Sequence, residues 1–409
     1  MCAKAPKEMT RKRLLPLWTI ILVLIGVSPA VAQIRPEAAT IDLAPRELVD
    51  RLRADPYAYF RFVNRPWIAR VCEEFADEVG ALPIVRLHGD AHVEQFGVTS
   101  EAWGLDDFDD SEQGSALIDI VRFLGSVDLV LRQRGWTGER ETLFDRFFAG
   151  YRNGLTDPQL QPPRPMIVNR IRAGTPRSRL EFLSWGEALM RPMEGPALEA
   201  VVAGLRAVEP LVAAQRRDLP PGYLTVIRAG WLQMGVGSAV VPKILIRVQG
   251  VSKAPDDDVL VEAKQARNLD GLRCRETPPS VQPTLRVVLG ATQLGRLKPN
   301  ILVAGPALVI PELVARGKEL RQWWLRSWDP SYRELHVADL RSARDLAAVG
   351  YDAGVQLGAG GMKEVSGVAR SGDRRRMLAL LKQLEPRIRE RTGGLVDDLL
   401  KGWNELRAQ

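Results

Sequence analysis

Cysteine and histidine are scarce in this chain, since each occurs only three times in 409 residues. Three cysteines exclude a disulfide-rich mini-protein, and three histidines leave few ligands for a His-rich zinc site. Lysine is absent between Arg13 and Lys243. No charge sign dominates: the net charge is +7 and 45% of the residues are apolar, which excludes a strongly charged disordered chain. The length predicts a globular protein of two or three structural units.

Residues 1–32 have the pattern of an export signal. A flank with five basic residues and one acid precedes an apolar stretch at residues 14–27, and Ala30-Val31-Ala32 supplies the small residues that a signal peptidase requires. We expect cleavage after Ala32. The alternative is an uncleaved anchor, through which alone the chain would contact a membrane. In both cases the rest is exported to the periplasm or the cell envelope.

Loss of this segment changes what the net charge means. The remaining chain carries a net charge of +3, because the segment holds five basic residues and one acid. No other part has a dense run of Lys and Arg with interleaved aromatic side chains, so nucleic acid is excluded as a partner. Two cysteines remain, Cys72 and Cys274. An oxidising compartment would permit a bridge between them, but their large separation favours two separate buried thiols.

Apolar spacing predicts a helical body with a small β-rich unit inserted late, hence an α+β fold. Helices are expected over residues 44–80, 116–131, 178–193 and 196–216. A period of two predicts strands at residues 243–248, 259–264 and 285–289. The rest is expected to be helical, with a glycine-rich interruption at residues 358–361 and an Arg-rich helix pair at the C-terminus. The corresponding divisions are a signal peptide (1–32), a helical lobe (33–223), a β-rich lobe (224–300) and a C-terminal helical region that completes the helical lobe (301–409).

The densest group of polar residues is His88-Gly89-Asp90-Ala91-His92, followed by four acids around Phe108. Each acidic loop follows a short apolar segment, as if a strand presented it. Mg²⁺ prefers one or two carboxylates together with substrate phosphates, and a further carboxylate can accept a proton from a hydroxyl nucleophile. The pattern therefore favours phosphate chemistry over ordinary acidic turns.

The polar segments around Asp90 and Phe108 resemble motifs of two groups of kinase-like proteins. The HGDAH segment is similar to the HGDxH catalytic loop of aminoglycoside-phosphotransferase-like kinases. The series GDAHVEQFG, DDFDD and G-x-x-x-x-D-I-V-R, which ends at Arg122, more closely resembles the bacterial DUF2252 family of uncharacterised kinase-like proteins. A second stretch, from Met234 to Lys264, is similar to the glycine turn and lysine-bearing strand of that family, and residues 286–290 extend it. The resemblance implies a two-lobed kinase-like fold with permuted element order.

The resemblance also implies roles. Asp90 would be the catalytic base, with His88 beside it in the catalytic motif, and Asp119 would hold the backbone of the loop. The implied metal ligands are Asp107, Gln95 and Asp109. The implied nucleotide-binding residues are Lys264, Gly235 and Gly237. An active enzyme would use Mg²⁺ with ATP or another nucleotide.

The chain departs from the kinase pattern in three ways. Gln95 replaces the expected asparagine, which weakens the second metal position. Glu262 shares a strand face with Lys264, where kinases favour a small residue. Two residues, Glu262 and Glu276, stay as alternatives for the glutamate that pairs with Lys264. Export is a further difficulty, because an exported protein meets little ATP.

Two other functions stay open. An exported pseudokinase-like protein would bind a small molecule or an envelope protein without catalysis. A metal-dependent hydrolase would use His88, Asp90 and His92 as ligands. We favour a structural role for both histidine rings, bonded to loop carbonyls. The tryptophans Trp323, Trp324 and Trp328 are more typical of a core than of a partner surface.

Overall fold

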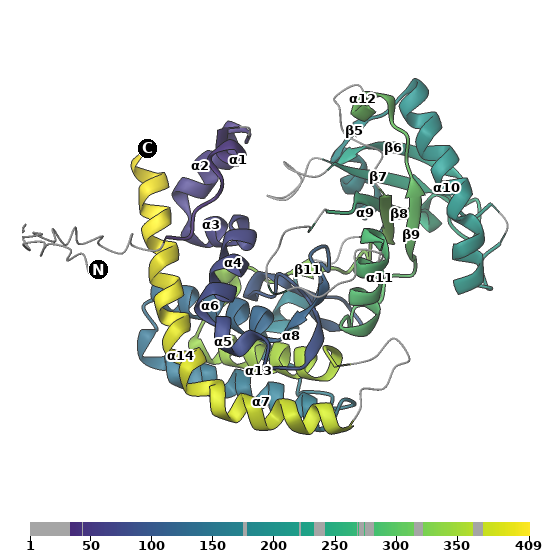
Figure 1. Ribbon diagram of the computed structural model, residues 1–409. Helices are drawn as coiled ribbons and strands as arrows, with labels where there is room; N and C mark the ends of the chain where they lie inside the picture. The colour runs from purple at the N-terminus through teal and green to yellow at the C-terminus, as the bar shows by residue number, and fades with distance from the viewer. Residues whose placement is uncertain are drawn as a thin grey trace, which may run out of the picture. The chain divides into compact units, whose positions relative to one another are not determined.

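Helices are the main elements of the computed structural model (Figure 1). It describes residues 33–42, 44–174, 178–220, 222–232, 242–267, 269, 274, 282–314, 322–362 and 371–409. The contents of 57% helix and 15% strand confirm the α+β class. The chain divides into two units, residues 1–32 and 33–409, and all that follows concerns the second. Within the described ranges, no helix combines the length and apolar character that a membrane span needs.

The helices and strands have the following bounds. The helices are α1 (Ala38–Asp42), α2 (Arg46–Ala54), α3 (Pro56–Phe62), α4 (Asn64–Glu74), α5 (Ala76–Val79), α6 (Leu117–Arg134), α7 (Arg140–Thr156), α8 (Met166–Arg172), α9 (Arg179–Ala188), α10 (Gly195–Gln215), α11 (Pro283–Gln293), α12 (Pro311–Val314), α13 (Ala343–Gly360) and α14 (Ser371–Ala408). The strands are β1 (Ile84–Leu87), β2 (Phe96–Val98), β3 (Trp103–Leu105), β4 (Glu112–Ser115), β5 (Met190–Pro192), β6 (Val226–Leu232), β7 (Lys243–Val248), β8 (Val259–Gln265), β9 (Leu302–Ala307), β10 (Gln322–Ser327) and β11 (Arg333–Glu334).

The largest hydrophobic core surrounds helix α6, in which every residue from Leu117 to Leu131 is buried. This confirms the apolar helix predicted at residues 116–131. Helices α3, α4, α7, α13 and α14 pack against it, and β1 adds Val85 and Leu87 to the same core. The core therefore fixes the ends of β1 and α6, from which the first polar loop and Asp119 project.

The interruption predicted at residues 358–361 begins later than expected, because α13 continues to Gly360 and a turn follows at residues 361–362. Glycine serves close packing here. A Cβ atom added at Gly358 would lie 2.2 Å from the carbonyl oxygen of Tyr151 on α7. The absence of side chains lets the two helices approach at their backbones. The predicted C-terminal helix pair is likewise one helix, α14.

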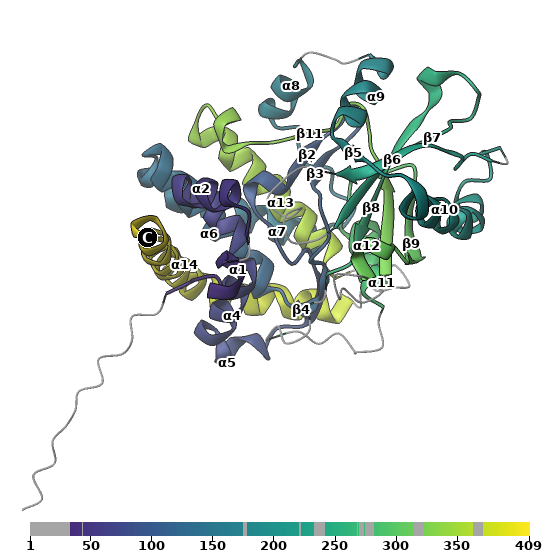
Figure 2. The same cartoon turned by 90° about the horizontal axis from the view of Figure 1, so that it is seen from above.

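A six-stranded antiparallel sheet with the order β5-β6-β7-β8-β10-β9 forms the second main layer (Figure 2). Its hairpin β7–β8 confirms the strands predicted at residues 243–248 and 259–264. One face packs on α10 through alternate apolar side chains, including Trp323. The other face carries α9 and, beyond it, polar side chains. Strands β9 and β10 lie within the region 301–409 that was expected to be helical, so the sheet extends past residue 300.

The strand predicted at residues 285–289 is wrong, since this segment belongs to α11. Pro283 occupies the first helical turn, where proline suits a helix start. Thr284, Val287 and Gly290 are buried, whereas Leu285 is 43% exposed. Burial therefore recurs every three residues, which is a helical spacing that the short apolar run did not reveal.

Two smaller sheets support the polar loops. Strand β1 pairs with β4, and β2 lies between β3 and β11. Cys72 of α4 and Cys274 form a disulfide with a Cα–Cα distance of 6.0 Å. The expectation of two separate thiols is therefore wrong. Sequence separation was a poor guide, because the fold brings α4 beside the segment that follows β8.

Candidate active site

The first polar loop follows β1, and Asp119 holds its backbone. Asp119 lies in the first turn of α6 and is buried; its two carboxylate oxygens accept hydrogen bonds from the backbone N–H groups of His88 (2.7 Å) and Gly89 (2.9 Å). Gly89 has a φ of +83°, a conformation that glycine adopts at little cost. A Cβ atom there would lie 1.9 Å from the carbonyl oxygen of Asp110. The two acidic loops therefore meet at this glycine.

Asp90 is bound from behind by Arg122. Its Oδ1 atom accepts a hydrogen bond from Nε of Arg122 (2.9 Å) and lies 2.8 Å from Nη2 of the same ion pair. The guanidinium group lies 3.6 Å from the ring centre of Phe60. Burial raises the pKa of Asp90 to about 6, although Arg122 opposes this shift. Asp90 therefore combines a fixed orientation with a proton affinity suited to a general base near neutral pH.

The histidine rings take structural positions. His88 donates from Nε2 to the carbonyl oxygen of Asp106 (2.8 Å) and accepts at Nδ1 from the backbone N–H of Asp90 (3.3 Å), which defines a neutral ring with both nitrogens used. His92 is fully buried, and burial lowers its pKa well below the usual range. Its Nε2 lies 3.8 Å from Asp90. This geometry does not favour the two rings as ligands of a shared metal.

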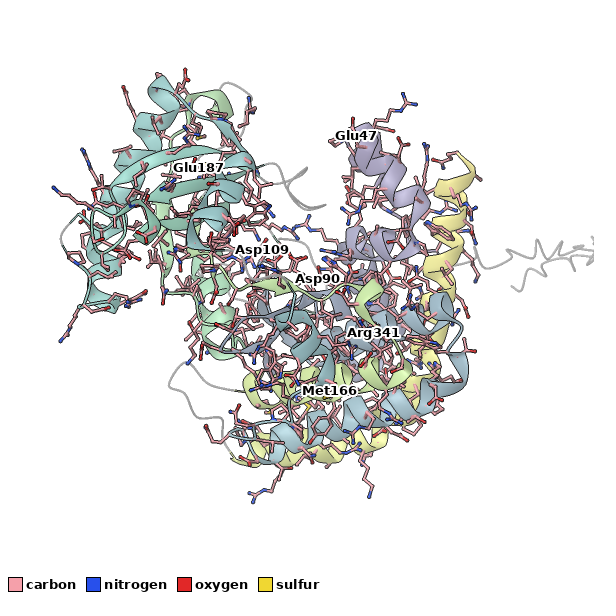
Figure 3. All side chains as sticks on the ribbon, turned by 180° about the vertical axis from the view of Figure 1, so that it is seen from behind. Glu47, Asp90, Asp109, Met166, Glu187 and Arg341 are labelled. Atoms are coloured by element: carbon pink, nitrogen blue, oxygen red, sulfur yellow. A yellow bond between two sulfur atoms is a disulfide. The ribbon has the colours of Figure 1, made fainter. Side chains whose placement is uncertain are left out.

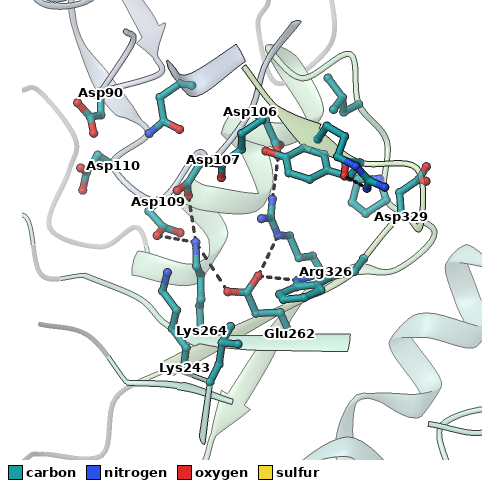
Figure 4. A pocket seen from close by; sticks show the side chains of 18 of the residues that line it. Asp90, Asp106, Asp107, Asp109, Asp110, Lys243, Glu262, Lys264, Arg326 and Asp329 are labelled. Atoms are coloured by element: carbon teal, nitrogen blue, oxygen red, sulfur yellow. Dashed lines mark hydrogen bonds and ion pairs between the residues drawn. The ribbon is translucent and has the colours of Figure 1, made fainter. Parts of the chain in front are cut away.

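The second loop presents Asp107 and Asp109 to Lys264 (Figure 4). Lys264 Nζ donates to Asp107 Oδ1 (3.1 Å) and Asp109 Oδ2 (3.0 Å). Asp107 has a φ of +62°, an uncommon conformation for a residue with a side chain, which occurs often at functional sites. Burial alone would raise the pKa of Asp107, but Lys264 and Lys243 outweigh it and hold this pKa well below its usual range. Burial and then Asp107 raise the pKa of Asp109.

A row of charged side chains on the large sheet forms the floor below these acids. Strand register places Lys243, Lys264 and Trp324 side by side, and beside them Glu262 and Arg326. Glu262 accepts from Arg326 Nε (3.2 Å) and from the indole N–H of Trp328 (2.9 Å). Its Oε1 lies 4.0 Å from Lys264 Nζ, so Glu262 is only a distant partner of that lysine.

Arginines tie the second loop to the sheet and to α11. Arg326 donates to Asp106 Oδ2 (3.1 Å), and Arg267 donates to Asp110 Oδ2 (2.8 Å). Arg286 of α11 donates to the carbonyl oxygens of Asp109 (2.6 Å) and Ser111 (2.8 Å). Sequence reasoning gave these arginines no role. Only Arg122 had a signal, because it lies three residues after Asp119 and therefore on the same side of a helix.

One cavity of about 1330 Å³ unites the two loops and the sheet. Figure 3 shows Asp90 and Asp109 close together between the sheet and the N-terminal helices. The structure thus brings together five of the residues expected at the site, with Asp119 behind them: Asp90, Gln95, Asp107, Asp109 and Lys264 line the cavity. Gly235, Gly237 and Glu276 lie outside the described residues. Lys243, to which the sequence analysis assigns no role, also lines the cavity.

These observations define an α+β protein whose cavity, between a six-stranded sheet and two loops, is lined by both acidic and basic side chains. Residues 45–181 match the family model of an uncharacterized protein conserved in bacteria (DUF2252). The family prediction is thereby confirmed over this segment, which contains both loops and Asp119 but not Lys264. No curated protein and no solved structure matches the chain.

Proposed function

We propose that this protein is a kinase-like phosphotransferase with permuted element order. One observation carries the proposal: the contact of Lys264 with Asp107 and Asp109, beside Asp90, in a single cavity. These residues come from segments about 160 positions apart, yet they supply the cation, the metal-binding acids and the base that phosphoryl transfer requires.

The sheet adds support. Strands β6-β7-β8-β10-β9 lie in the order that the small lobe of protein kinases uses, and Lys264 is at the end of the third of them in sequence. Helix α11 follows this strand, as a helix does in kinases. The acidic loops precede the sheet in the sequence instead of following it, so the proposed relation to kinases includes a permutation.

The acids suit a divalent cation. Asp109 Oδ1 is buried and has no hydrogen-bond partner among the described residues, while Asp107 stays ionised. Oxygen atoms of this kind are the ligands that Mg²⁺ prefers, and Gln95 lines the same cavity. A bound Mg²⁺ would neutralise phosphate oxygens. Within the described part of the chain no group of three or more His, Cys, Asp or Glu side chains is gathered for a metal, so substrate phosphates would complete the coordination.

Each residue of the site would have its own role in phosphoryl transfer. Asp90 would accept the proton of the attacking hydroxyl, and Arg122 keeps its carboxylate oriented toward the cavity. Asp119 holds the loop backbone through its two hydrogen bonds, and Arg286 does the same for the second loop. Lys264 would move its contacts from the acids toward the phosphates of the donor.

A second candidate is a binding protein without catalysis. Helix α11 contains no acidic residue, so the usual helix glutamate for Lys264 is missing, and the lysine lies on the metal-binding acids instead. The same geometry would then hold a phosphorylated ligand. The disulfide Cys72–Cys274 supports the proposed export to the periplasm or envelope, because such bonds persist in oxidising compartments. Residues 1–32, the proposed signal, lie outside the described residues.

The test uses residues 33–409 purified with the disulfide formed. Thermal unfolding and calorimetric titration with Mg²⁺-ATP and Mg²⁺-GTP should show stabilisation and binding, both lost in Asp107→Ala. Phosphate release or transfer then separates enzyme from binding protein: binding without turnover supports the second candidate. No response to any nucleotide would contradict the kinase proposal. Stabilisation by Zn²⁺ alone, lost in His92→Ala, would support the hydrolase.

A further inference from the structure

Lys243 is the one lysine of the cavity floor whose role the site described above leaves open. It begins β7 directly opposite Lys264 of β8, and both line the cavity. Figure 4 shows their ammonium groups side by side and directed toward the acidic loop. Like charges that are directly opposite on neighbouring strands repel each other, so this pairing costs the free protein stability.

The nearby carboxylates are engaged by other cations. Asp107 and Asp109 accept from Lys264, and Glu262 accepts from Arg326 and Trp328. Among the described residues, Lys243 has no hydrogen bond or ion pair of its own. Burial and the charge of Lys264 lower the pKa of Lys243 to about 8. Asp107, Asp109 and Glu262 attract this ammonium group without a direct contact. A half-buried ammonium group that lacks a hydrogen-bonded anion is one that a bound anion would satisfy.

We propose that Lys243 binds phosphate beside Lys264, so that the cavity takes a ligand with two or more linked phosphates, such as a nucleoside di- or triphosphate. This inference rests on the proposed function, since it assigns the same cavity. Two ammonium groups that lie side by side can each bind a different phosphate group, and a divalent cation on Asp107 and Asp109 would offset the charge of these acids, which fits a phosphate chain better than a single phosphate. The site therefore selects its ligand by the number of linked phosphate groups.

The experiment compares wild type, Lys243→Met and the control Lys253→Met, which removes an exposed lysine from the turn between the same two strands. Calorimetry is done with Mg²⁺-ATP, Mg²⁺-ADP, AMP and inorganic tripolyphosphate. We expect Lys243→Met to weaken binding of ATP, ADP and tripolyphosphate about tenfold or more and that of AMP less than about twofold. Lys253→Met should bind like wild type. The melting temperature of ligand-free Lys243→Met should not fall, because the substitution removes a repulsion.

The outcomes separate the inference from the proposed function. Equal affinity of wild type and Lys243→Met for ATP would overturn the inference and leave the proposed function standing. An equal loss of AMP and ATP affinity would also overturn it, because the residue would then only maintain the cavity. Tripolyphosphate binding that depends on Lys243, without nucleotide binding, would support the inference and contradict a nucleotide donor. No binding of any phosphate compound would contradict both.

Discussion

Two ion-pair networks of the site differ in how far they open onto the cavity: the closed network of Arg122 with Asp90 and the open network of Lys264 with Asp107 and Asp109. Arg122 and Asp90 are both buried, lie 32 positions apart and belong to the core around α6. Lys264 contacts Asp107 and Asp109 across the cavity, over 157 and 155 positions. The first network fixes a loop. Each network has one buried atom without a hydrogen-bond partner in the described chain, Arg122 Nη1 in the first and Asp109 Oδ1 in the second. The second also includes Asp107, whose side chain is 34% exposed, so it is the part that can change its contacts when a ligand binds.

The largest effect is expected when the closed network is broken. Arg122→Met leaves a buried carboxylate without its cation and removes the contact with Phe60, so we expect the free energy of unfolding to fall by about 3–5 kcal/mol. Urea denaturation measures it. The control on the same helix is Arg132→Met, whose ion pairs with Asp128 and Asp397 are partly exposed; its cost should be about 1 kcal/mol. Equal losses of unfolding free energy in Arg122→Met and Arg132→Met would contradict the larger contribution expected from the buried pair of Arg122 and Asp90.

The contact between the two loops can be broken at Gly89. Gly89→Ala combines a left-handed backbone with a Cβ atom 1.9 Å from the carbonyl oxygen of Asp110, so we expect a loss of about 2–5 kcal/mol. Gly135→Ala has a similar φ, +71°, but open space around the Cβ position. It should cost about 1–2 kcal/mol by the same denaturation. A smaller loss at Gly89 than at Gly135 would contradict the tight contact between the loops.

The open network should cost less to break. Lys264→Met leaves Asp107, whose side chain is 34% exposed, in contact with water, and the more buried Asp109 can take up a proton, so a loss of about 1–2 kcal/mol is expected. Binding of Mg²⁺-nucleotide should be abolished in the same protein. A loss as large as that of Arg122→Met would show that this pair, too, is a closed structural element.

The smallest effect concerns pH. The folded pKa of Asp90, about 6, lies above that of an unfolded aspartate, so the folded chain binds this proton first as pH falls. As pH falls from 6 to 4, protonation of Asp90 therefore raises the free energy of unfolding. Transfer activity that needs an ionised Asp90 declines over the same range. Parallel profiles of turnover and unfolding should move in opposite directions. Asp90→Asn should flatten this part of the stability profile; an unchanged profile would contradict the assignment.

The sequence predicted those parts of the site in which chemistry and local pattern coincide. The two acidic loops, the β7–β8 hairpin and Lys264 at its end were visible because acids follow apolar segments and apolar residues alternate. The sequence pattern predicts a strand where α11 lies, since five residues of which four are apolar fit either structure. Proline at position 283 was the available signal.

The partners of the charged residues could not be predicted. Arg267, Arg286 and Arg326 reach the second loop only because the sheet and α11 pack next to it, and arginine is too common in this chain to stand out. Lys243 is different: it is the first lysine after Lys12, and it begins an alternating strand. The same signal that indicated Lys264 applied to it, but its alignment with Lys264 depends on strand register, which a long hairpin loop does not fix.

The disulfide between Cys72 and Cys274 encloses both acidic loops, α6 and strands β5 to β8 in a covalent ring. Arg326, which donates hydrogen bonds to both Asp106 and Glu262, lies outside this ring. A protease that cuts once inside the ring would therefore leave two fragments of the site joined, and they would separate in a gel only after reduction. The ring also makes the oxidised chain less able to expand when it unfolds, so the cavity is held together by chain topology as well as by its charges.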